Sequence, residues 1–401
     1  MPHRHPTPLM LLRHAFRPLL VGLTLAALGC GGTATQTEAR SPAETRGPEQ
    51  LTVERQVITP GDATSLSELF EEAKREFDAG HFKVAAQKFN EVYRLEPRGE
   101  LAPHALFNAG HSQDSAGELD AAYESYRRLL SEFPKSELMR DALIRCVRLA
   151  GFLERWEDGG KLAELGLSRI SKPNPFEVAT LRSALALALL QQGDVERASY
   201  QVERARGVVE ASQLDRAGRL PSEFAQLYFA LGEIRRVRGE AIVFSPAPPN
   251  FAQVLEERCQ LLLDAQSAYS DTMRAYDAHW SAMAGFRVGE LYKRLHEDLM
   301  KVPPPKAADT EQRRQLFEGA MRLRYSVLLK KGLQLMEHTL SMADRTGEHS
   351  SWVDRARQAK AELQAAIKRE QAALDALPYT RTELQAALDD LAARAKTTAV
   401  P

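Results

Sequence analysis

The fold is decided by residues 69–97, LFEEAKREFDAGHFKVAAQKFNEVYRLEP, because their spacing returns 37 positions later in residues 106–134, LFNAGHSQDSAGELDAAYESYRRLLSEFP. In both stretches apolar and small residues recur every three or four positions, which is typical of a buried helix face. Gly80 and Gly117 separate two such runs, and glycine can end a helix at positive φ without steric cost. Each stretch therefore predicts two antiparallel helices joined by a short turn.

Two further copies follow the same pattern. The third begins at Leu143, again offset by 37, and carries Glu154 at the turn position. The fourth begins at Arg182, is offset by 39, and has Gly193 at its turn. A single helix pair cannot bury its apolar face alone, so the copies are expected to stack into an all-α solenoid.

These spacings resemble the tetratricopeptide repeat (TPR), and the resemblance covers about residues 66–210. It implies a TPR-like right-handed α-solenoid, with an irregular helical bundle as the alternative. We assign residues 65–244 to TPR-like repeats and residues 250–396 to a degenerate, long-helix region with no strand pattern. The end of that region could pair with a partner helix in a coiled coil or form a solvated capping helix.

Helix-start signals support this division. Ser65 with Glu68 and Asn174 with Glu177 predict capping boxes, in which each side chain bonds a backbone N–H of the other residue. The same pattern occurs at Ser351 with Asp354 and at Thr380 with Glu383. These four positions predict where helices begin.

The N-terminus has the features of an export signal. Residues 1–29 are basic, contain no acid and end in a 10-residue apolar run, which is too short to cross a bilayer. The Gly29-Cys30 junction resembles a bacterial lipobox, although Ala27 stands where that family prefers Leu. The resemblance implies lipidation at Cys30 and an outer-membrane anchor facing the periplasm. A plain signal peptide with an incidental cysteine is the alternative.

Residues 30–64 follow as a lipidated cysteine and a polar linker with little apolar periodicity, which predicts a disordered tether. The whole chain has a formal charge of -1, and removing Arg4, Arg13 and Arg17 with the signal leaves the mature chain mildly acidic. A nucleic-acid partner usually requires a basic excess, so we expect none.

No catalytic motif is complete. Lys161 lacks the Ser or Thr that follows the lysine of a phosphate loop, and His296-Glu297 has Met300 where a zinc-protease helix needs its second histidine. Cys146 and Cys259 lie on apolar helical faces, so we expect buried thiols, with a disulfide left open. We therefore expect a protein that is not an enzyme and that holds no metal or cofactor.

In the resembled family the first helix of each unit lines a concave groove for protein partners. Carried onto this chain, the lining residues are Phe70, Lys74, Phe77, Phe107, Asn108, His111, Ile144, Arg145, Arg148, Leu187 and Leu190. Asn108 and Arg145 match two positions that some family members use to hold a peptide carboxylate, whereas Phe70 and Asp141 replace the lysines of that clamp. An extended or helical segment with aromatic anchors is therefore the expected ligand, unless Phe70 and Phe107 are simply packed between helices.

Together these observations predict a lipid-anchored interaction scaffold in an envelope assembly, such as outer-membrane biogenesis, secretion or gliding motility. Two alternatives are a periplasmic regulator of cell-wall (peptidoglycan) enzymes and an enzyme hidden in residues 245–345.

Overall fold

The computed structural model describes residues 63–387 except 215–219, 246, 249 and 307. The predicted signal peptide, Cys30 and nearly all of the predicted tether lie outside the described residues. The described part contains helices and turns and no strand, which confirms the all-α class.

The first four helix pairs reproduce the predicted repeat. They are α3 (Ala63–Asp78) with α4 (Phe82–Leu95), α5 (Ala102–Ser115) with α6 (Leu119–Glu132), α7 (Met139–Phe152) with α8 (Trp156–Arg169), and α9 (Pro175–Gln191) with α10 (Val195–Ala211). The second helices of the first three pairs begin at residues 82, 119 and 156, which is the predicted spacing of 37. The fourth begins 39 residues later, also as the sequence pattern requires.

The two helices of each pair are joined by the same three-residue turn, whose middle residue has a left-handed backbone conformation. Gly80, Gly117 and Gly193 occupy this position with φ between 76° and 80°. In the third pair Glu154 occupies it with φ of 55°. A side chain in this conformation costs about 1 kcal/mol that glycine avoids, so Glu154 is a local exception that its own contacts must offset.

Two of the four predicted helix starts are confirmed. The Asn174 side chain accepts hydrogen bonds from the backbone of Phe176 and Glu177, and the Glu177 carboxylate accepts one from the Asn174 N–H at 2.7 Å. Thr380 and Glu383 make the same reciprocal bonds, at 2.6 and 3.3 Å.

The other two predicted starts were wrong, by at least three residues in α3 and by one residue in α15. Ser65 lies inside α3, which already begins at Ala63. In α15 the N-cap is Ser350 and not Ser351, because the Ser350 N–H is held by the Glu348 carboxylate at 3.1 Å, which fixes the loop one residue earlier.

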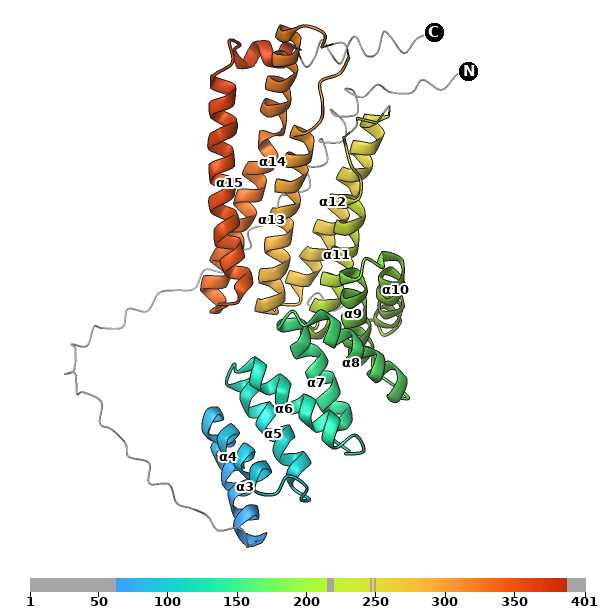
Figure 1. Cartoon of the computed structure of the whole chain (residues 1–401), viewed down its shortest axis with the longest axis vertical. Helices are drawn as coiled ribbons and strands as arrows, with labels where there is room; N and C mark the ends of the chain where they lie inside the picture. Colours follow the sequence, from blue (N-terminus) through green and yellow to red (C-terminus); the bar gives the residue numbers. More distant parts are fainter. Residues whose placement is uncertain (1–62, 215–219, 246, 249, 307, 388–401) are drawn as a thin grey trace, which may run out of the picture.

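Longer helices continue the array: α11 (Ala225–Glu240), α12 (Phe251–Arg274), α13 (Ala278–Met300), α14 (Glu311–Thr346) and α15 (Ser351–Asp375), with a short 3₁₀ turn at Ser222–Phe224. Figure 1 shows α3–α8 as a curved arm of short helices and α11–α15 as longer, nearly upright helices. Helix α11 packs against α12, so helix pairing continues across residues 241–250. Helices α7, α9, α11, α13 and α15 contact one another in series, so every second helix lies on one face of a continuous solenoid.

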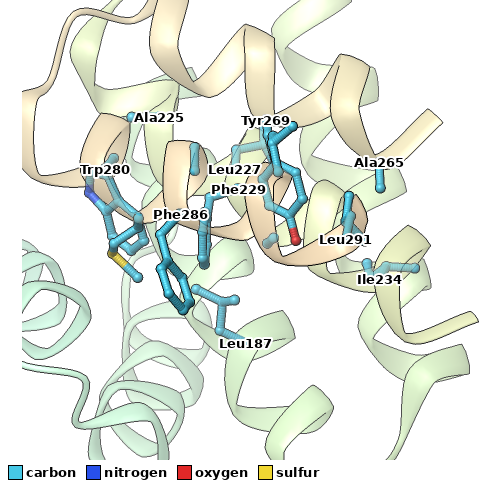
Figure 2. Close-up of a cluster of buried hydrophobic side chains, with 14 of the residues drawn as sticks. Leu187, Ala225, Leu227, Phe229, Ile234, Ala265, Tyr269, Trp280, Phe286 and Leu291 are labelled. Atoms are coloured by element: carbon cyan, nitrogen blue, oxygen red, sulfur yellow. The ribbon is translucent and has the colours of Figure 1, made fainter. Parts of the chain in front are cut away.

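The largest apolar cluster extends from α7 to α15. Figure 2 shows its centre, where Phe229, Tyr269, Trp280 and Phe286 pack together with Leu187. Two smaller clusters serve the arm, one around Tyr123 and Tyr126 and one around Phe89. The core is therefore a chain of neighbouring contacts along the array, as expected for stacked helix pairs.

The two cysteines of the described region are free thiols, and both are buried as predicted. Burial raises the pKa of Cys146 and of Cys259 to about 12. Both thiols are therefore protonated and unreactive at neutral pH.

Candidate protein-binding face

Helices α3, α5 and α7, the first helices of the first three pairs, bring their predicted groove residues onto one surface, which we call the arm face. The Phe77 ring of α3 lies 4.8 Å from the His111 ring of α5. The Arg145 guanidinium of α7 lies over the Phe107 ring of α5, 5.6 Å from its centroid. These cross-helix contacts form a strip of half-exposed aromatic and basic groups.

Asp114 is the electrostatic centre of this strip. Its carboxylate hydrogen bonds to Arg148 and lies 3.9 Å from Arg145. Burial and the nearby charge of Arg145 lower the pKa of His111, so its ring is neutral at physiological pH. Both arginine side chains remain partly exposed, so a partner's carboxylate can reach them.

The other predicted residues of the arm have varied positions. Lys74 is exposed and pairs with Glu71 at 3.0 Å, and Ile144 packs against the main core. Phe70 lies edge-on to Phe89 of α4 at 5.2 Å, and Phe107 lies edge-on to Tyr126 of α6 at 5.6 Å. Both rings are therefore held between the helices of their own pair and remain only half-exposed.

Asn108 and Arg145, the two residues that match a carboxylate clamp, lie on neighbouring helices of the arm face. Arg145 is already engaged by Phe107 and Asp114. The arrangement favours side-chain recognition by the whole strip over capture of a single chain terminus.

Leu187 and Leu190 lie apart from this strip. Leu187 is only 6% exposed, and both leucines line a small hollow of about 110 Å³ further along the solenoid. Its other walls come from α11, α13, α15 and the α7–α8 turn: Glu154, Trp156, Gln191, Phe229, Glu233, Arg236, Val237, Arg287 and Trp352. Within the described region, the predicted groove therefore divides into an open arm face and this narrower hollow.

A buried charge network forms one wall of the hollow. Glu233 is held by Arg236 at 2.8 Å, by Arg287 at 3.0 Å and by the Tyr269 hydroxyl at 2.5 Å. Burial alone would raise the pKa of Glu233, but Arg287 and Arg236 hold the pKa of this carboxyl below its ordinary value. The network thus ties α11, α12 and α13 together through groups that are costly to leave unpaired.

Helix α15 contacts the turn between α7 and α8 at Glu154. The Arg355 guanidinium of α15 binds the Glu154 carboxylate with two hydrogen bonds, at 3.0 and 3.1 Å, and also lies 4.1 Å from the centroid of Trp352. Ser351 contributes a third bond to Glu154 at 3.3 Å. These contacts, which we call the Glu154 latch, join residues about 200 positions apart, and Glu154 and Trp352 both line the hollow beside Leu187.

Sequence reasoning missed several of these functional side chains. Asp114 occupies the same unit position as Phe77, so the rule that selected Phe77 also points to it. The sequence marked Glu154 only as a turn residue that is not glycine, and it gave no indication of the contact with α15. Trp352, Arg287 and Glu233 gave no local signal, because their roles arise from contacts between distant helices.

Around His296 and Glu297, where an enzyme site was the alternative prediction, charged side chains pair with one another. An open hollow adjoins them, but Glu297 lies 3.9 Å from Lys293, and Glu370 is bound by Arg322 at 2.8 Å. No group of three or more metal-binding side chains occurs in the part of the chain that the structure describes. In the same part, no helix is both long and apolar enough to cross a membrane.

Comparisons with known proteins give only distant similarities. No protein-family model and no curated protein matches the chain. Among solved structures, a tetratricopeptide repeat protein from Parabacteroides merdae is similar, with a TM-score of 0.40 and 16% identity over 75% of this chain and 100% of that chain. A TPR repeats protein from Bacteroides fragilis has a TM-score of 0.27 and 12% identity, over 66% and 98% of the two chains. The P58(IPK) TPR domain has a TM-score of 0.26 and 12% identity, over 84% and 99%.

The fold class therefore rests on the chain's own geometry: repeated antiparallel pairs, a recurring left-handed turn and a face built from every second helix. These features define a TPR-like α-solenoid. This architecture exposes an extended helical surface suited to binding other proteins.

Proposed function

We propose that this chain is a protein-interaction scaffold whose arm face holds a segment of a partner protein. The observation that carries the proposal is the strip on α3, α5 and α7, where half-exposed aromatic rings lie beside Arg145 and Arg148, both of which are close to Asp114. Aromatic and arginine side chains are the residues that most often supply binding energy at protein interfaces. An extended or helical segment with apolar anchors and a carboxylate is the ligand that fits this chemistry.

We further propose that the scaffold belongs to the bacterial cell envelope and is anchored at Cys30 to the outer membrane, with its helical body in the periplasm. The support is the basic, acid-free N-terminus with its short apolar run and Gly-Cys junction. A diacylated or triacylated cysteine is sufficient for stable anchoring, because each acyl chain adds about 0.8 kcal/mol per buried methylene. Outer-membrane biogenesis, secretion and gliding motility are the assemblies this placement favours.

Affinity purification of the mature protein from its native cell tests the partner assignment. Replacing Phe107 and Arg148 together with Ala should reduce recovery of the partner while the circular dichroism of the helices is retained. Arg128→Ala is the matched control, since Arg128 lies on the outer helix α6, where it pairs with Glu132 at 3.7 Å and lies 5.4 Å from the centroid of the Tyr93 ring, away from the arm face. Unchanged recovery with the double variant would place the interface elsewhere, and recovery of cell-wall synthases alone would favour the regulator of peptidoglycan enzymes.

Membrane fractionation tests the anchor separately. Cys30→Ala should move the protein from the membrane fraction to the soluble periplasmic fraction. Retention of the variant in the membrane fraction would show that lipidation at Cys30 is not the anchor.

A further inference from the structure

A second and larger hollow, of about 500 Å³, opens between α13 and α15, far along the sequence from the arm face. Its residues come from the later halves of both helices and from one position of α14: Lys293, His296, Glu297, Met300, Lys301, Leu329, Glu362, Ala365, Ala366, Arg369 and Glu370. It lies where the alternate helices α13 and α15 meet, on the same series of helices as the arm face.

The floor of this hollow is apolar. Met300 and Leu329 form its base, and Ala365 and Ala366 leave space above them because their side chains are a single methyl group. Side chains this small allow another helix to approach α15 closely. The floor can therefore accept one large apolar side chain from outside.

The rim is charged, and two of its cations are incompletely neutralised. Lys293 is paired with Glu362 and also lies 3.9 Å from Glu297, and Glu370 is paired with Arg322. No ion pair joins Arg369 to an acid within the described residues, and Lys301 shares Asp298 with Arg258, at 3.3 and 3.6 Å. Arg369 and Lys301 are thus available to a carboxylate arriving from a partner.

His296 leaves one polar atom unsatisfied in the wall of this hollow. The side chain is only 4% exposed, and its Nε2 atom has no hydrogen-bond partner among the described residues. Burial lowers the pKa of His296, so the imidazole is neutral and offers one hydrogen bond at this nitrogen. The Nε2 atom itself is not reachable from outside, so the unpaired nitrogen leaves this wall of the hollow unsatisfied by about 1–3 kcal/mol.

The shape favours a protein segment over a small molecule. Small-molecule sites are enclosed and mostly apolar, whereas this hollow is open to solvent and has a charged rim. We propose that it is a second docking site, for a partner helix that presents one large apolar side chain with a carboxylate one helical turn away. The apolar side chain covers Met300 and Leu329, and the carboxylate pairs with Arg369 and Lys301. This site goes beyond the proposed function, because it shares no residue with the arm face.

Three labelled helical peptides of about 18 residues test this proposal with the full-length chain. The first carries Leu with Glu four positions later on an otherwise Ala- and Gln-rich helix. The second has Lys in place of the Glu, and the third has Ala in place of the Leu. Fluorescence anisotropy should show binding of the first peptide, and binding of the other two weaker by about tenfold.

Variants of the chain complete the design. Arg369→Glu should weaken binding of the first peptide and strengthen binding of the second. Arg357→Glu, on the same helix but outside the hollow, should change neither affinity. Arg148→Ala should leave all three affinities unchanged, because it belongs to the arm face. Equal binding of the three peptides, no binding of the first, or loss of its binding in Arg148→Ala would overturn the proposal.

Discussion

At the scale of single residues, Glu154 combines a backbone cost with a long-range contact. Its φ of 55° is the conformation that glycine adopts in the other three repeat turns. The carboxylate at this position binds Arg355 and Ser351 of α15, which a glycine could not do. The repeat spacing favoured glycine at this position. The one turn that departs from the pattern is therefore the turn that contacts α15.

Charge reversal tests the Glu154 latch. Arg355→Glu should destabilise the start of α15 by about 1 kcal/mol, since it replaces a partly exposed, two-bonded ion pair with repulsion between two acids. Hydrogen exchange of the amides in residues 351–356 measures the effect. The double variant Glu154→Arg with Arg355→Glu should recover part of the lost protection. Identical exchange in the original chain and in Arg355→Glu would show that the latch does not hold α15.

Glu348 gives the fold a dependence on acid pH. Hydrogen bonding to His279, followed by that to Ser350, lowers the pKa of Glu348 from 4.5 to about 2. Because the folded-state pKa is the lower one, the stabilising effect is complete above about pH 4.5 and is lost as the pH falls toward 2. The stability difference between the original chain and Glu348→Gln should therefore be largest above pH 4.5 and shrink below it. Urea unfolding at a series of pH values measures this difference, and a constant difference would contradict the assignment.

At the scale of helices, close packing depends on small residues at a few positions. A Cβ atom on Gly232 of α11 would lie 2.5 Å from the Tyr269 ring of α12, which is fully buried and fixed by its bond to Glu233. Gly207 of α10, by contrast, has nothing within 4 Å of the same added atom. The two glycines therefore have different reasons to be present, although both lie within helices.

Replacement of these glycines separates packing from helix propensity. Gly232→Ala should destabilise the chain by about 1–3 kcal/mol, because the ring cannot move aside. Gly207→Ala should stabilise it by about 0.5–1 kcal/mol, because alanine is the better helix former and meets no clash. Thermal unfolding of the two variants measures both effects, and a change of the same sign in both would refute the packing argument.

Helices with regular spacing could be predicted from sequence, and contacts between distant helices could not. The glycines at positions 80, 117 and 193 marked the turns, and Asn174 and Thr380 marked helix starts, because these signals act within a few residues. The same local reasoning misplaced Ser65 and Ser351. Local reasoning also placed Leu187 in the groove, but it gave no sign that α15 contributes to the same hollow. That contribution depends on contacts between distant helices, such as the bond from Arg355 to Glu154.

At the scale of the whole molecule, one series of alternate helices carries both proposed binding sites. Alternate helices form a continuous inner series from α7 to α15, and cross-helix contacts add α3 and α5. Along this series, the Glu154 latch separates the arm face from the α13–α15 hollow. Two sites on one solenoid would allow the chain to hold two protein segments at once, which is the property that a scaffold requires.

Site-specific photo-crosslinking in the native cell tests directly whether the arm face binds a protein. A photoreactive amino acid is placed at Lys74 and at Ile144 on the arm face, and at Val84 and Lys161 on the outer helices of the same two pairs. A discrete crosslinked partner is expected at Lys74 and Ile144, and none at Val84 and Lys161. Crosslinks at the outer positions alone, or at all four positions equally, would contradict it.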